Sequence, residues 1–428
     1  MAPSYGWYGD DFTGATDTLA TIARRGRRAF LFLRVPEERH LSELNDLDAI
    51  GIAGAARTMN PAEMQAELAP VGAFFRKIGV RVVHYKCCST FDSALERGNI
   101  AAAVAVLRDH VESTTTAIIG GQPSLGRYCA FSNLFATFGA NGETFRLDRH
   151  PTMSRHPATP MNEADLAKHI LSLGLPDVAS IHWPLLDQGA EALAAEWGRL
   201  SRSASAVLFD ALTPSHIAAI GQLCRAVSQK QSLLIVGASS VAQAYFEETG
   251  APAIRPNVSA EGPVLAFVGS LSPMTRMQVA AAQSYHRISI DPESLTTSDG
   301  AREQIIAKAV EGLSQGLNVM LSTAPESGEA PKASMDSLAD CSAALVDSVL
   351  KRHRVSRLAV VGGDTSSKIV GGLGFWGLGY HGQISNGVAV SVARSDDRER
   401  DNMLVMLKGG QMGHEQLFET FLERDAAW

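Results

Sequence analysis

Two adjacent acidic residues near the start of the chain, Asp10 and Asp11, stand between a short apolar stretch and a helix-forming one. Carboxylates of this kind can accept or orient a hydroxyl proton, and open α/β sheets keep their chemistry at the carboxyl ends of strands. Because side chains alternate along a strand, we expect the two carboxylates to point in different directions if the strand continues that far, so that one faces a ligand. In the alternative interpretation, both acids only favour the start of a helix through its dipole.

Charged and hydroxyl residues follow two further predicted strands in the first half of the chain. Arg57 comes after one strand, and Lys86 comes after another, with Ser89 and Asp92 close behind it. The forked guanidinium of an arginine suits a carboxylate. If the strands are parallel, these residues share one sheet edge with the acidic pair and predict a pocket for a small carboxylate or polyol. The alternative for Lys86 and Arg57 is a solvated charge at a strand end.

Three turns rich in glycine and hydroxyl residues follow predicted strands in the second half of the chain, at residues 269–273, 362–367 and 408–413. Glycine lets the backbone approach a phosphate, and a helix N-terminus offers unpaired amides. Together the turns predict a polyphosphate cradle. Taken alone, Ser272 followed by proline is also an ordinary helix cap. The chain has no Walker-type loop, so a nucleotide would be held without the usual P-loop lysine.

Alternating strands and helices must position these residues. Up to about residue 250, apolar runs alternate with amphipathic helices, which is typical of a mainly parallel sheet covered on both faces. Residues 122–160 break this pattern and predict an irregular insertion. Residues 251–263, rich in glycine and proline, predict a linker. We therefore predict an α/β protein of two domains, residues 1–250 and 264–428, each a mainly parallel sheet flanked by helices.

Composition narrows the class of protein further. The chain has 428 residues, a net charge of −7 and no long run of residues with the same charge. It therefore lacks the basic patch that nucleic-acid-binding proteins show. No apolar run approaches the length that spans a membrane, and the start of the chain does not resemble a signal peptide. The five cysteines show no metal-binding spacing and suggest reduced thiols. We expect a cytoplasmic protein that meets an anionic substrate with a few placed cations.

The motifs together resemble those of the four-carbon acid sugar kinases, a family long catalogued as a domain of unknown function. They occur in the family's order and cover almost the whole chain. The matching segments are residues 9–17 (GDDFTGATD), 86–93 (KCCSTFDS), 98–100 (GNI), 156–161 (HPATPM), 269–272 (GSLS) and 362–366 (GGDTS).

The resemblance implies that the N-terminal domain binds a short sugar acid and the C-terminal domain binds ATP, with phosphoryl transfer in the interdomain cleft. Phosphoryl transfer needs one residue to orient the attacking hydroxyl, and we expect Asp11 or Asp10 to be this catalytic residue, with Asp11 favoured because it is nearer the helix start. We expect Mg²⁺ to bridge the phosphates without a dedicated protein site. The implied substrate contacts are Thr13, Gly14, Arg57, Lys86, Ser89, Asp92, Arg127, His156 and Thr159. The implied nucleotide contacts are Ser270, Ser272, Gly362, Gly363, Asp364, Thr365, Gly410 and Gly413. A homodimer is the assembly that we consider.

The resemblance leaves the sugar acid open among threonate, erythronate and 3-oxo-tetronate. The chain departs from the family's usual residues at 55–56, 125–128, 364 and 411–412, and the first two departures touch the expected substrate pocket. Two other functions compete with the kinase. An aspartate-dependent sugar phosphatase would need an Asp-x-Asp spacing where this chain has adjacent acids, and a non-catalytic sugar-acid sensor would bind its ligand without releasing ADP.

Overall fold

The computed structural model describes residues 3–44, 46–138, 142–156, 158–251, 253, 256, 258, 260–270, 272–323 and 335–423, without the side chains of residues 335, 336 and 364. The chain divides into two compact units, Met1–Ala253 and Ile254–Trp428, which we call unit 1 and unit 2. The predicted linker, residues 251–263, contains this boundary and lies partly outside the described residues. The predicted α/β class, with a mostly parallel sheet and flanking helices, is confirmed in both units.

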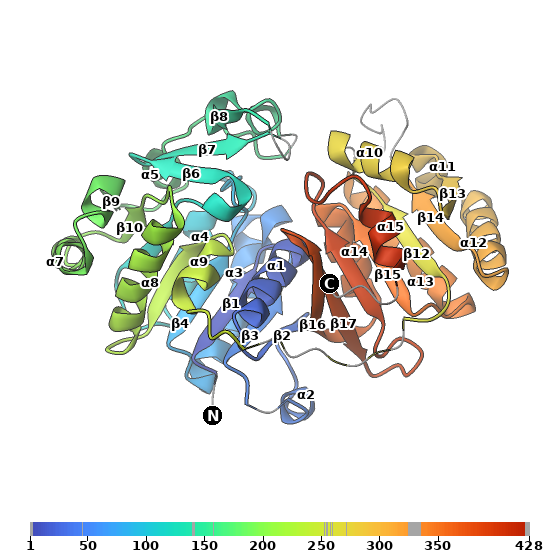
Figure 1. Ribbon diagram of the computed structural model, residues 1–428, viewed down its shortest axis with the longest axis horizontal. Coiled ribbons are helices and arrows are strands. Elements are labelled where there is room, and N and C mark those ends of the chain that lie inside the picture. The colour runs from blue at the N-terminus through green and yellow to red at the C-terminus, as the bar shows by residue number, and fades with distance from the viewer. Residues whose placement is uncertain are drawn as a thin grey trace. The chain divides into compact units, whose positions relative to one another are not determined.

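The main sheet of unit 1 is parallel, and its described strands lie in the order β2-β3-β1-β4-β11-β5-β10-β9 (Figure 1). These strands are β1 (Tyr5–Gly9), β2 (Ala29–Phe32), β3 (Ala49–Ala53), β4 (Val82–Lys86), β5 (Thr116–Ile119), β9 (Val178–Ile181), β10 (Ala206–Phe209) and β11 (Leu233–Gly237). Parallel strands covered on both faces are buried along their whole length, as β1, β3, β4 and β11 are. Gly51 in β3 leaves the space that the Trp7 ring fills.

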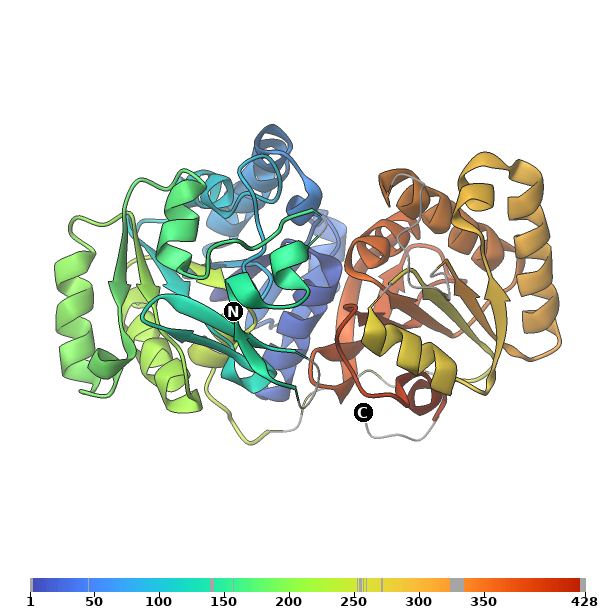
Figure 2. The same cartoon turned by 90° about the horizontal axis from the view of Figure 1, so that it is seen from above.

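Helices cover both faces of this sheet (Figure 2). On one face, α3 (Pro61–Ile78), α4 (Ile100–Arg108) and α5 (Leu166–Ser172) lie side by side. On the other face lie α1 (Phe12–Arg24), α9 (Ser240–Tyr245), α8 (Pro214–Ser228) and α7 (Ala190–Leu200). The short helices α2 (Glu38–Ser42) and α6 (Trp183–Leu186) complete the unit.

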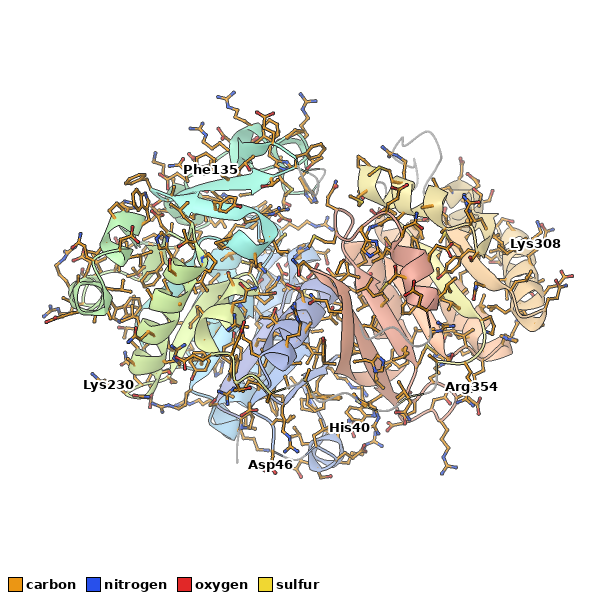
Figure 3. The ribbon with its side chains drawn as sticks, in the orientation of Figure 1. His40, Asp46, Phe135, Lys230, Lys308 and Arg354 are labelled. Carbon is orange, nitrogen blue, oxygen red and sulfur yellow. The ribbon has the colours of Figure 1, made fainter. Side chains whose placement is uncertain are left out.

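The predicted irregular insertion is wrong in part, because it contains a small antiparallel sheet of β6 (Arg127–Ala130), β7 (Asn133–Thr137) and β8 (Thr144–Arg146). This sheet lies beyond the carboxyl ends of the main strands (Figure 1), and Phe135 projects from it in Figure 3. The β6–β7 turn has positive φ at both Phe131 and Ser132, where no glycine marks the turn in the sequence. The Asp210 carboxylate anchors this turn: it accepts bonds from the backbone N–H of Phe131 (2.7 Å) and of Ser132 (2.9 Å).

The sheet of unit 2 combines parallel strands with an antiparallel hairpin, in the order β13-β14-β12-β15-β18-β17-β16. Strands β17 and β16 are antiparallel to their neighbours in this unit and were not expected. The glycines of β16 dilute its strand signal in the sequence. The strands are β12 (Val264–Val268), β13 (Tyr285–Ser289), β14 (Asn318–Ser322), β15 (Arg357–Val361), β16 (Phe375–Ser385), β17 (Val388–Ser395) and β18 (Leu404–Lys408).

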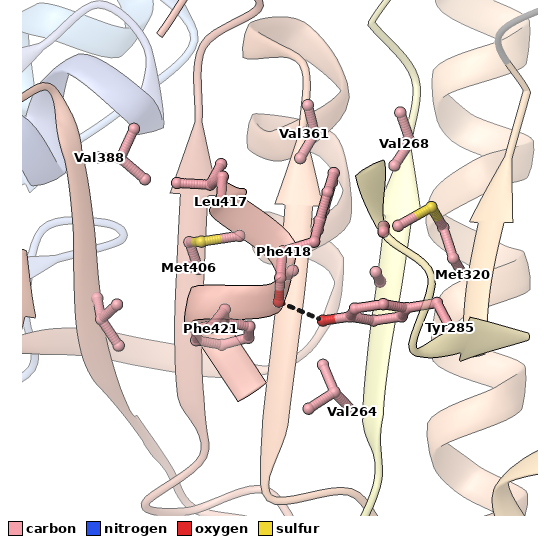
Figure 4. Close-up of a cluster of buried hydrophobic side chains, with 14 of the residues drawn as sticks. Val264, Val268, Tyr285, Met320, Val361, Val388, Met406, Leu417, Phe418 and Phe421 are labelled. Carbon is pink, nitrogen blue, oxygen red and sulfur yellow. Dashed lines mark hydrogen bonds between the residues drawn. The ribbon is translucent and has the colours of Figure 1, made fainter. Parts of the chain in front are cut away.

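Helices also cover both faces of this second sheet. Helices α11 (Pro292–Thr297), α12 (Asp299–Ser314), α13 (Met335–Arg352) and α14 (Gly363–Gly372) pack on one face. Helices α10 (Pro273–Ala281) and α15 (Leu417–Leu422) pack together on the other. Under α15, Phe418 and Phe421 cover apolar side chains of the sheet, and the Tyr285 hydroxyl donates a 3.3 Å bond to the Phe418 carbonyl (Figure 4). Lys308 on α12 points away from the sheet in Figure 3.

Candidate active site

The carboxyl ends of four neighbouring strands in unit 1 lie level with one another. In the sheet register, Gly9 of β1 lies beside Ala53 of β3 and Lys86 of β4, and Gly237 of β11 also lies beside Lys86. The segments that leave these strands therefore meet at one edge of the sheet. These segments carry most of the predicted unit 1 residues.

Asp10 and Asp11 share one guanidinium. Arg57 Nη2 donates to Asp10 Oδ1 at 2.9 Å and Arg57 Nε to Asp10 Oδ2 at 3.4 Å, while Arg57 Nη1 donates to Asp11 Oδ2 at 2.8 Å. The strand ends at Gly9, before both acids, so the alternation of a strand does not apply to them. The sequence predicted that the two carboxylates would point in different directions. In the structure, both carboxylates bind the same guanidinium. We call Asp10, Asp11 and Arg57 the acidic cluster.

The two carboxylates of the cluster differ in their other bonds. Asp11 is the N-cap of α1: its Oδ1 accepts the Gly14 backbone N–H at 2.7 Å, and its Oδ2 accepts the Thr13 hydroxyl at 2.8 Å. Asp11 therefore caps the helix, as the alternative interpretation of the acidic pair expects. Asp10, which is 4% exposed, has the Arg57 bonds alone among those described for its side chain. Asp10 therefore keeps more of its acceptor capacity for a ligand.

The pKa values of the two acids move in opposite directions. Burial raises the pKa of Asp10 to about 6, and the Asp11 charge adds to this rise, while the Arg57 and Lys86 charges oppose it. Burial also acts on Asp11, but the Arg57 and Lys86 charges and the Thr13 and Gly14 bonds outweigh it and lower the Asp11 pKa. Two carboxylates with separated pKa values can divide a proton-accepting role from a purely electrostatic one.

Lys86 closes one side of the acidic cluster. Its side chain is buried, and its Nζ donates a 2.7 Å bond to the Cys87 carbonyl. A Cβ at Gly14 would lie 2.5 Å from both Lys86 Nζ and Asp11 Oδ1, so the ammonium approaches the first turn of α1 through a space that only glycine leaves free.

Asp17, further along α1, accepts a bond from Ser239, and burial raises its pKa.

Asp92 belongs to the same charged region. The Thr90 hydroxyl donates to Asp92 Oδ1 at 2.5 Å. Burial raises the pKa of Asp92, but the Arg57 charge and the Thr90 bond outweigh it and the net pKa is lowered. Ser89 is half-buried in the same loop.

His156 and Thr159 bond to each other. The ring Nδ1 of His156 accepts the Thr159 backbone N–H at 3.2 Å and lies 3.0 Å from the Thr159 hydroxyl. Since Nδ1 accepts an N–H bond, Nε2 is the nitrogen that carries the proton in the neutral ring. His156 also contributes to the lowered pKa of Asp92, which connects this loop to the charged region.

Arg127 is a half-buried cation without an acidic partner among the described residues. Its Nη1 donates to the carbonyls of Leu125 (2.6 Å) and Thr137 (3.3 Å), whereas its buried Nε has no hydrogen-bond partner there. Burial lowers the pKa of Arg127, and Cys88 of the Lys86 loop lies within its electrostatic reach. An unsatisfied guanidinium nitrogen of this kind marks a place for an anionic ligand.

Two of the three glycine turns of unit 2 meet directly. Ser272 caps α10 by accepting the Thr275 N–H at 3.1 Å, and it also donates to the Gly410 carbonyl. The Thr275 hydroxyl lies 3.2 Å from Ser270 Oγ and 3.0 Å from the Gly410 carbonyl. A Cβ at Gly410 would lie 2.8 Å from Ser270 Oγ. The first and third turns thus form one cradle with hydroxyls at a helix start.

The middle turn joins this cradle at Gly362, which has a φ of +125°, and at Gly363, where α14 begins. A Cβ at Gly269 would lie 2.6 Å from the Thr365 hydroxyl. Gly413, with a φ of +87°, ends the third turn. The Asp364 side chain lies outside the described residues. Glycine backbone, hydroxyls and two helix starts fit the phosphates of a nucleotide.

Lys408 is absent from the predicted nucleotide contacts but belongs to this cradle. It ends β18, its side chain is fully buried, and its Nζ donates to the Thr275 hydroxyl (2.7 Å) and the Gly410 carbonyl (3.0 Å). Burial lowers the Lys408 pKa to about 7. The signal in the sequence was a lysine that ends an apolar strand directly before two glycines.

Comparison with known proteins identifies the family. Residues 5–245 match the family described as the sugar-binding N-terminal domain, and residues 265–418 match the one described as the nucleotide-binding C-terminal domain. The chain belongs to the four-carbon acid sugar kinases. The enzyme is a kinase, a phosphotransferase that acts on an alcohol group. The names of its curated relatives support four-carbon acid sugars as the substrates of this enzyme.

Curated relatives of this kinase cover nearly the whole chain. A 3-oxo-isoapionate kinase of Paraburkholderia graminis is 31% identical over 96% of this chain and 92% of its own. A 3-oxo-tetronate kinase of Methylobacterium radiotolerans is 29% identical over 99% of both chains, and one of Cupriavidus necator is 26% identical over 99% of this chain and 97% of its own.

Solved structures share the fold over the same length. A Salmonella typhimurium LT2 protein, provisionally described as a tRNA synthase, gives a TM-score of 0.80 at 26% identity and covers 97% of this chain and 98% of its own. A Haemophilus influenzae protein gives a TM-score of 0.71 at 23% identity with the same coverage.

Within the described residues, no group of at least three His, Cys, Asp or Glu side chains is placed to hold a metal ion. No helix in the described part of the chain has the length and apolar character needed to cross a membrane. The homodimer stays a prediction.

Proposed function

We propose that this kinase transfers the γ-phosphate of ATP to a hydroxyl group of a short sugar acid such as 3-oxo-tetronate, threonate or erythronate. The observation that carries the proposal is the acidic cluster at the strand ends of the sugar-binding domain, in which a buried Asp10 with a pKa of about 6 stands beside Arg57 and Lys86. A carboxylate with this pKa is ionised near neutral pH and basic enough to take a hydroxyl proton.

Asp10, rather than Asp11, is the proton acceptor in this proposal. Asp11 is engaged by the Gly14 amide, the Thr13 hydroxyl and Arg57, and its lowered pKa makes it the weaker base. It contributes a fixed negative charge that helps to raise the Asp10 pKa. This assignment reverses the preference for Asp11 drawn from the sequence.

The substrate carboxylate is assigned to Arg127 rather than to Arg57. All three nitrogens of the Arg57 guanidinium already donate to Asp10 or Asp11, so Arg57 orients the base. Arg127 has an unpartnered buried Nε and no acidic partner among the described residues. Lys86, Ser89, Asp92, His156 and Thr159 remain the proposed contacts of the sugar acid.

The nucleotide is assigned to the cradle of unit 2, with contacts at Ser270, Ser272, Gly362, Gly363, Asp364, Thr365, Gly410 and Gly413. Mg²⁺, which commonly binds through substrate phosphates and few carboxylates, would be held mainly by the phosphates and would neutralise the charge that develops during transfer. Direct transfer requires the hydroxyl held by unit 1 to meet the phosphate held by unit 2 during turnover.

The proposed transfer takes place in one step. Asp10 accepts the proton of the substrate hydroxyl while the oxygen forms a bond to the γ-phosphorus and the bond to the β-phosphate oxygen breaks. ADP leaves with that oxygen, and the phosphorylated sugar acid leaves from unit 1. Asp10 then returns its proton to solvent. Arg57 holds the acceptor carboxylate in place throughout, while the charges of Asp11 and Lys86 act on its pKa.

A substrate panel tests the proposal. ADP release is measured with ATP, Mg²⁺ and each of 3-oxo-tetronate, threonate, erythronate and 3-oxo-isoapionate. We expect one of these acids to give turnover well above the rate without acid. ATP-independent phosphate release from sugar phosphates would instead support a phosphatase, and binding of an acid without ADP release would support a sensor.

Separate Asp10→Asn and Asp11→Asn variants test the assignment of the base. Loss of a general base typically costs about 100-fold to 10,000-fold in rate, so Asp10→Asn should lose kcat on this scale. Asn also serves as an N-cap, so Asp11→Asn should fold and retain more activity. Near-normal turnover of Asp10→Asn at saturating substrate contradicts the assignment.

A further inference from the structure

Lys408 occupies a position where a lysine is costly unless its charge is used. Its side chain is fully buried at the end of β18, and no described carboxylate forms an ion pair with it. A charged lysine has three N–H donors, and two of them go to the Thr275 hydroxyl and the Gly410 carbonyl. Burying an ammonium without a counter-ion is unfavourable, and an apolar side chain of similar length would fill the same space more cheaply.

The surroundings of the Lys408 ammonium favour an anion. Thr275 lies in the first turn of α10, where the helix dipole is positive and repels a second positive charge. The Gly362 N–H donates to the Lys408 carbonyl at 2.9 Å, and Val361 lies beside Lys408 in the sheet register. The first and third glycine turns thus contact the Lys408 side chain, and the middle turn contacts its backbone.

No described charge around Lys408 substitutes for an anion. Burial accounts for its lowered pKa, and no neighbouring charge offsets it. On α14, Lys368 pairs with Asp340 at 2.9 Å, which directs its charge away from the cradle. The titratable residues of the packed elements and of the third turn are Arg276 on α10, Arg357 on β15, Asp364 and Lys368 on α14, Arg394 on β17, Glu419 on α15 and His414.

We propose that Lys408 binds the phosphate chain of the nucleotide from beneath the three glycine turns, as the cation that a P-loop lysine would otherwise supply. This inference rests on the proposed use of ATP by unit 2. In the free protein the Lys408 amino group is held by Thr275 and Gly410, and on binding its charged form donates to a phosphate oxygen, which supplies the missing counter-ion.

The proposal couples nucleotide binding to protonation. A lysine with a pKa of about 7 is mostly neutral at pH 8. A bound phosphate favours the charged form and restores the pKa toward its ordinary value. Lys408 then takes up about 0.9 proton per nucleotide at pH 8. For the same reason, the affinity for ADP should fall about 5-fold from pH 7 to 8 and about 9-fold from pH 8 to 9 as neutral Lys408 becomes more abundant.

Calorimetric titration with ADP and Mg²⁺ at pH 8 tests the proposal. Buffers of different ionisation heat give the number of protons taken up. The Lys408→Met variant should bind ADP about 10-fold to 100-fold more weakly, the range expected for one charged hydrogen bond, and should lose the uptake. Lys308→Met, an exposed lysine of the same unit, is the matched control and should behave as wild type (Figure 3).

Each outcome separates the two proposals. If Lys408→Met binds ADP within twofold of wild type and takes up the same number of protons, the assignment of Lys408 is overturned while ATP use stands. If wild-type protein binds neither ATP nor ADP, the proposed function fails with it. If Lys408→Met does not fold, the pH dependence of ADP affinity in wild type decides, because an affinity that stays constant between pH 7 and 9 overturns the proposal.

Discussion

Replacement of Arg57 by glutamine tests whether this residue tunes the base or binds the substrate. The guanidinium lies 2.9 Å and 3.4 Å from the two oxygens of Asp10 and 2.8 Å from Asp11. An opposite charge this close typically lowers the pKa of an aspartate by about 1 to 3 units. Removing it should raise the Asp10 pKa from about 6 to about 7 to 9.

The expected effect is a shift of the acidic limb of the pH profile. Asp10 must be ionised to accept a proton, so kcat/KM of wild type should fall as the pH drops below about 6. In Arg57→Gln the same fall should begin about 1 to 3 units higher, so the variant is roughly 2-fold to 100-fold slower than wild type at pH 7 and recovers toward pH 9.

The assay is ADP release measured from pH 5 to pH 9.5 with the acid that the substrate panel identifies. Arg127→Gln is the matched control, because loss of a substrate-carboxylate contact should raise KM and leave the acidic limb in place. An Arg57→Gln variant with an unmoved limb and a raised KM refutes the positioning role and restores the interpretation of Arg57 as a substrate ligand.

Three further predictions concern stability and glycine contacts. Because the folded-state pKa of Lys408 is lowered from 10.5 to about 7, the unfolded chain binds more protons between these values, and wild type should gain about 2 to 3 kcal/mol over Lys408→Met between pH 7 and 9 in urea unfolding. A pH-independent difference would contradict this. Gly14→Ala places a Cβ 2.5 Å from Lys86 Nζ and should cost about 1 to 3 kcal/mol in unfolding free energy as well as activity; unchanged values would show that Lys86 can move. Gly410→Ala places a Cβ 2.8 Å from Ser270 Oγ and should weaken ADP binding about 5-fold to 100-fold in calorimetry without changing sugar-acid binding; equal losses for both ligands would refute a local effect.

The alternating elements could be predicted from the sequence because apolar runs and amphipathic helices carry strong local signals. The strands at residues 49–53, 206–209, 264–268, 318–322 and 357–361 each contain one of these apolar runs. The hairpin of β16 and β17 was not predicted, since its glycines and its almost wholly buried second strand hide the alternation. The small sheet was not predicted because its turn has positive φ at Phe131 and Ser132, where no glycine marks it in the sequence.

The residue types of the site could be predicted more easily than their partners. Strand ends placed Asp10 and Lys86 at one edge, which follows from parallel pairing. The sequence could not show that Arg57 would be occupied by two carboxylates while Arg127 kept an unpartnered nitrogen, because both facts depend on contacts between distant segments. The burial of Lys408 depends likewise on the way two turns close over it.

If Arg127 binds the sugar acid as proposed, the anchoring of the β6–β7 hairpin separates the residue that selects the substrate from the residues that carry out the transfer. Asp210 holds the turn of this hairpin, and Cys129 exchanges two backbone bonds with Ala211 at the end of β10, whereas the acidic cluster sits on the segments after β1 and β3. Arg127, on the first strand of the hairpin, can therefore be replaced or shifted without disturbing the base. In a laboratory recombination between relatives, the hairpin is the segment to exchange when a new acid is wanted, with the residue that fastens it retained.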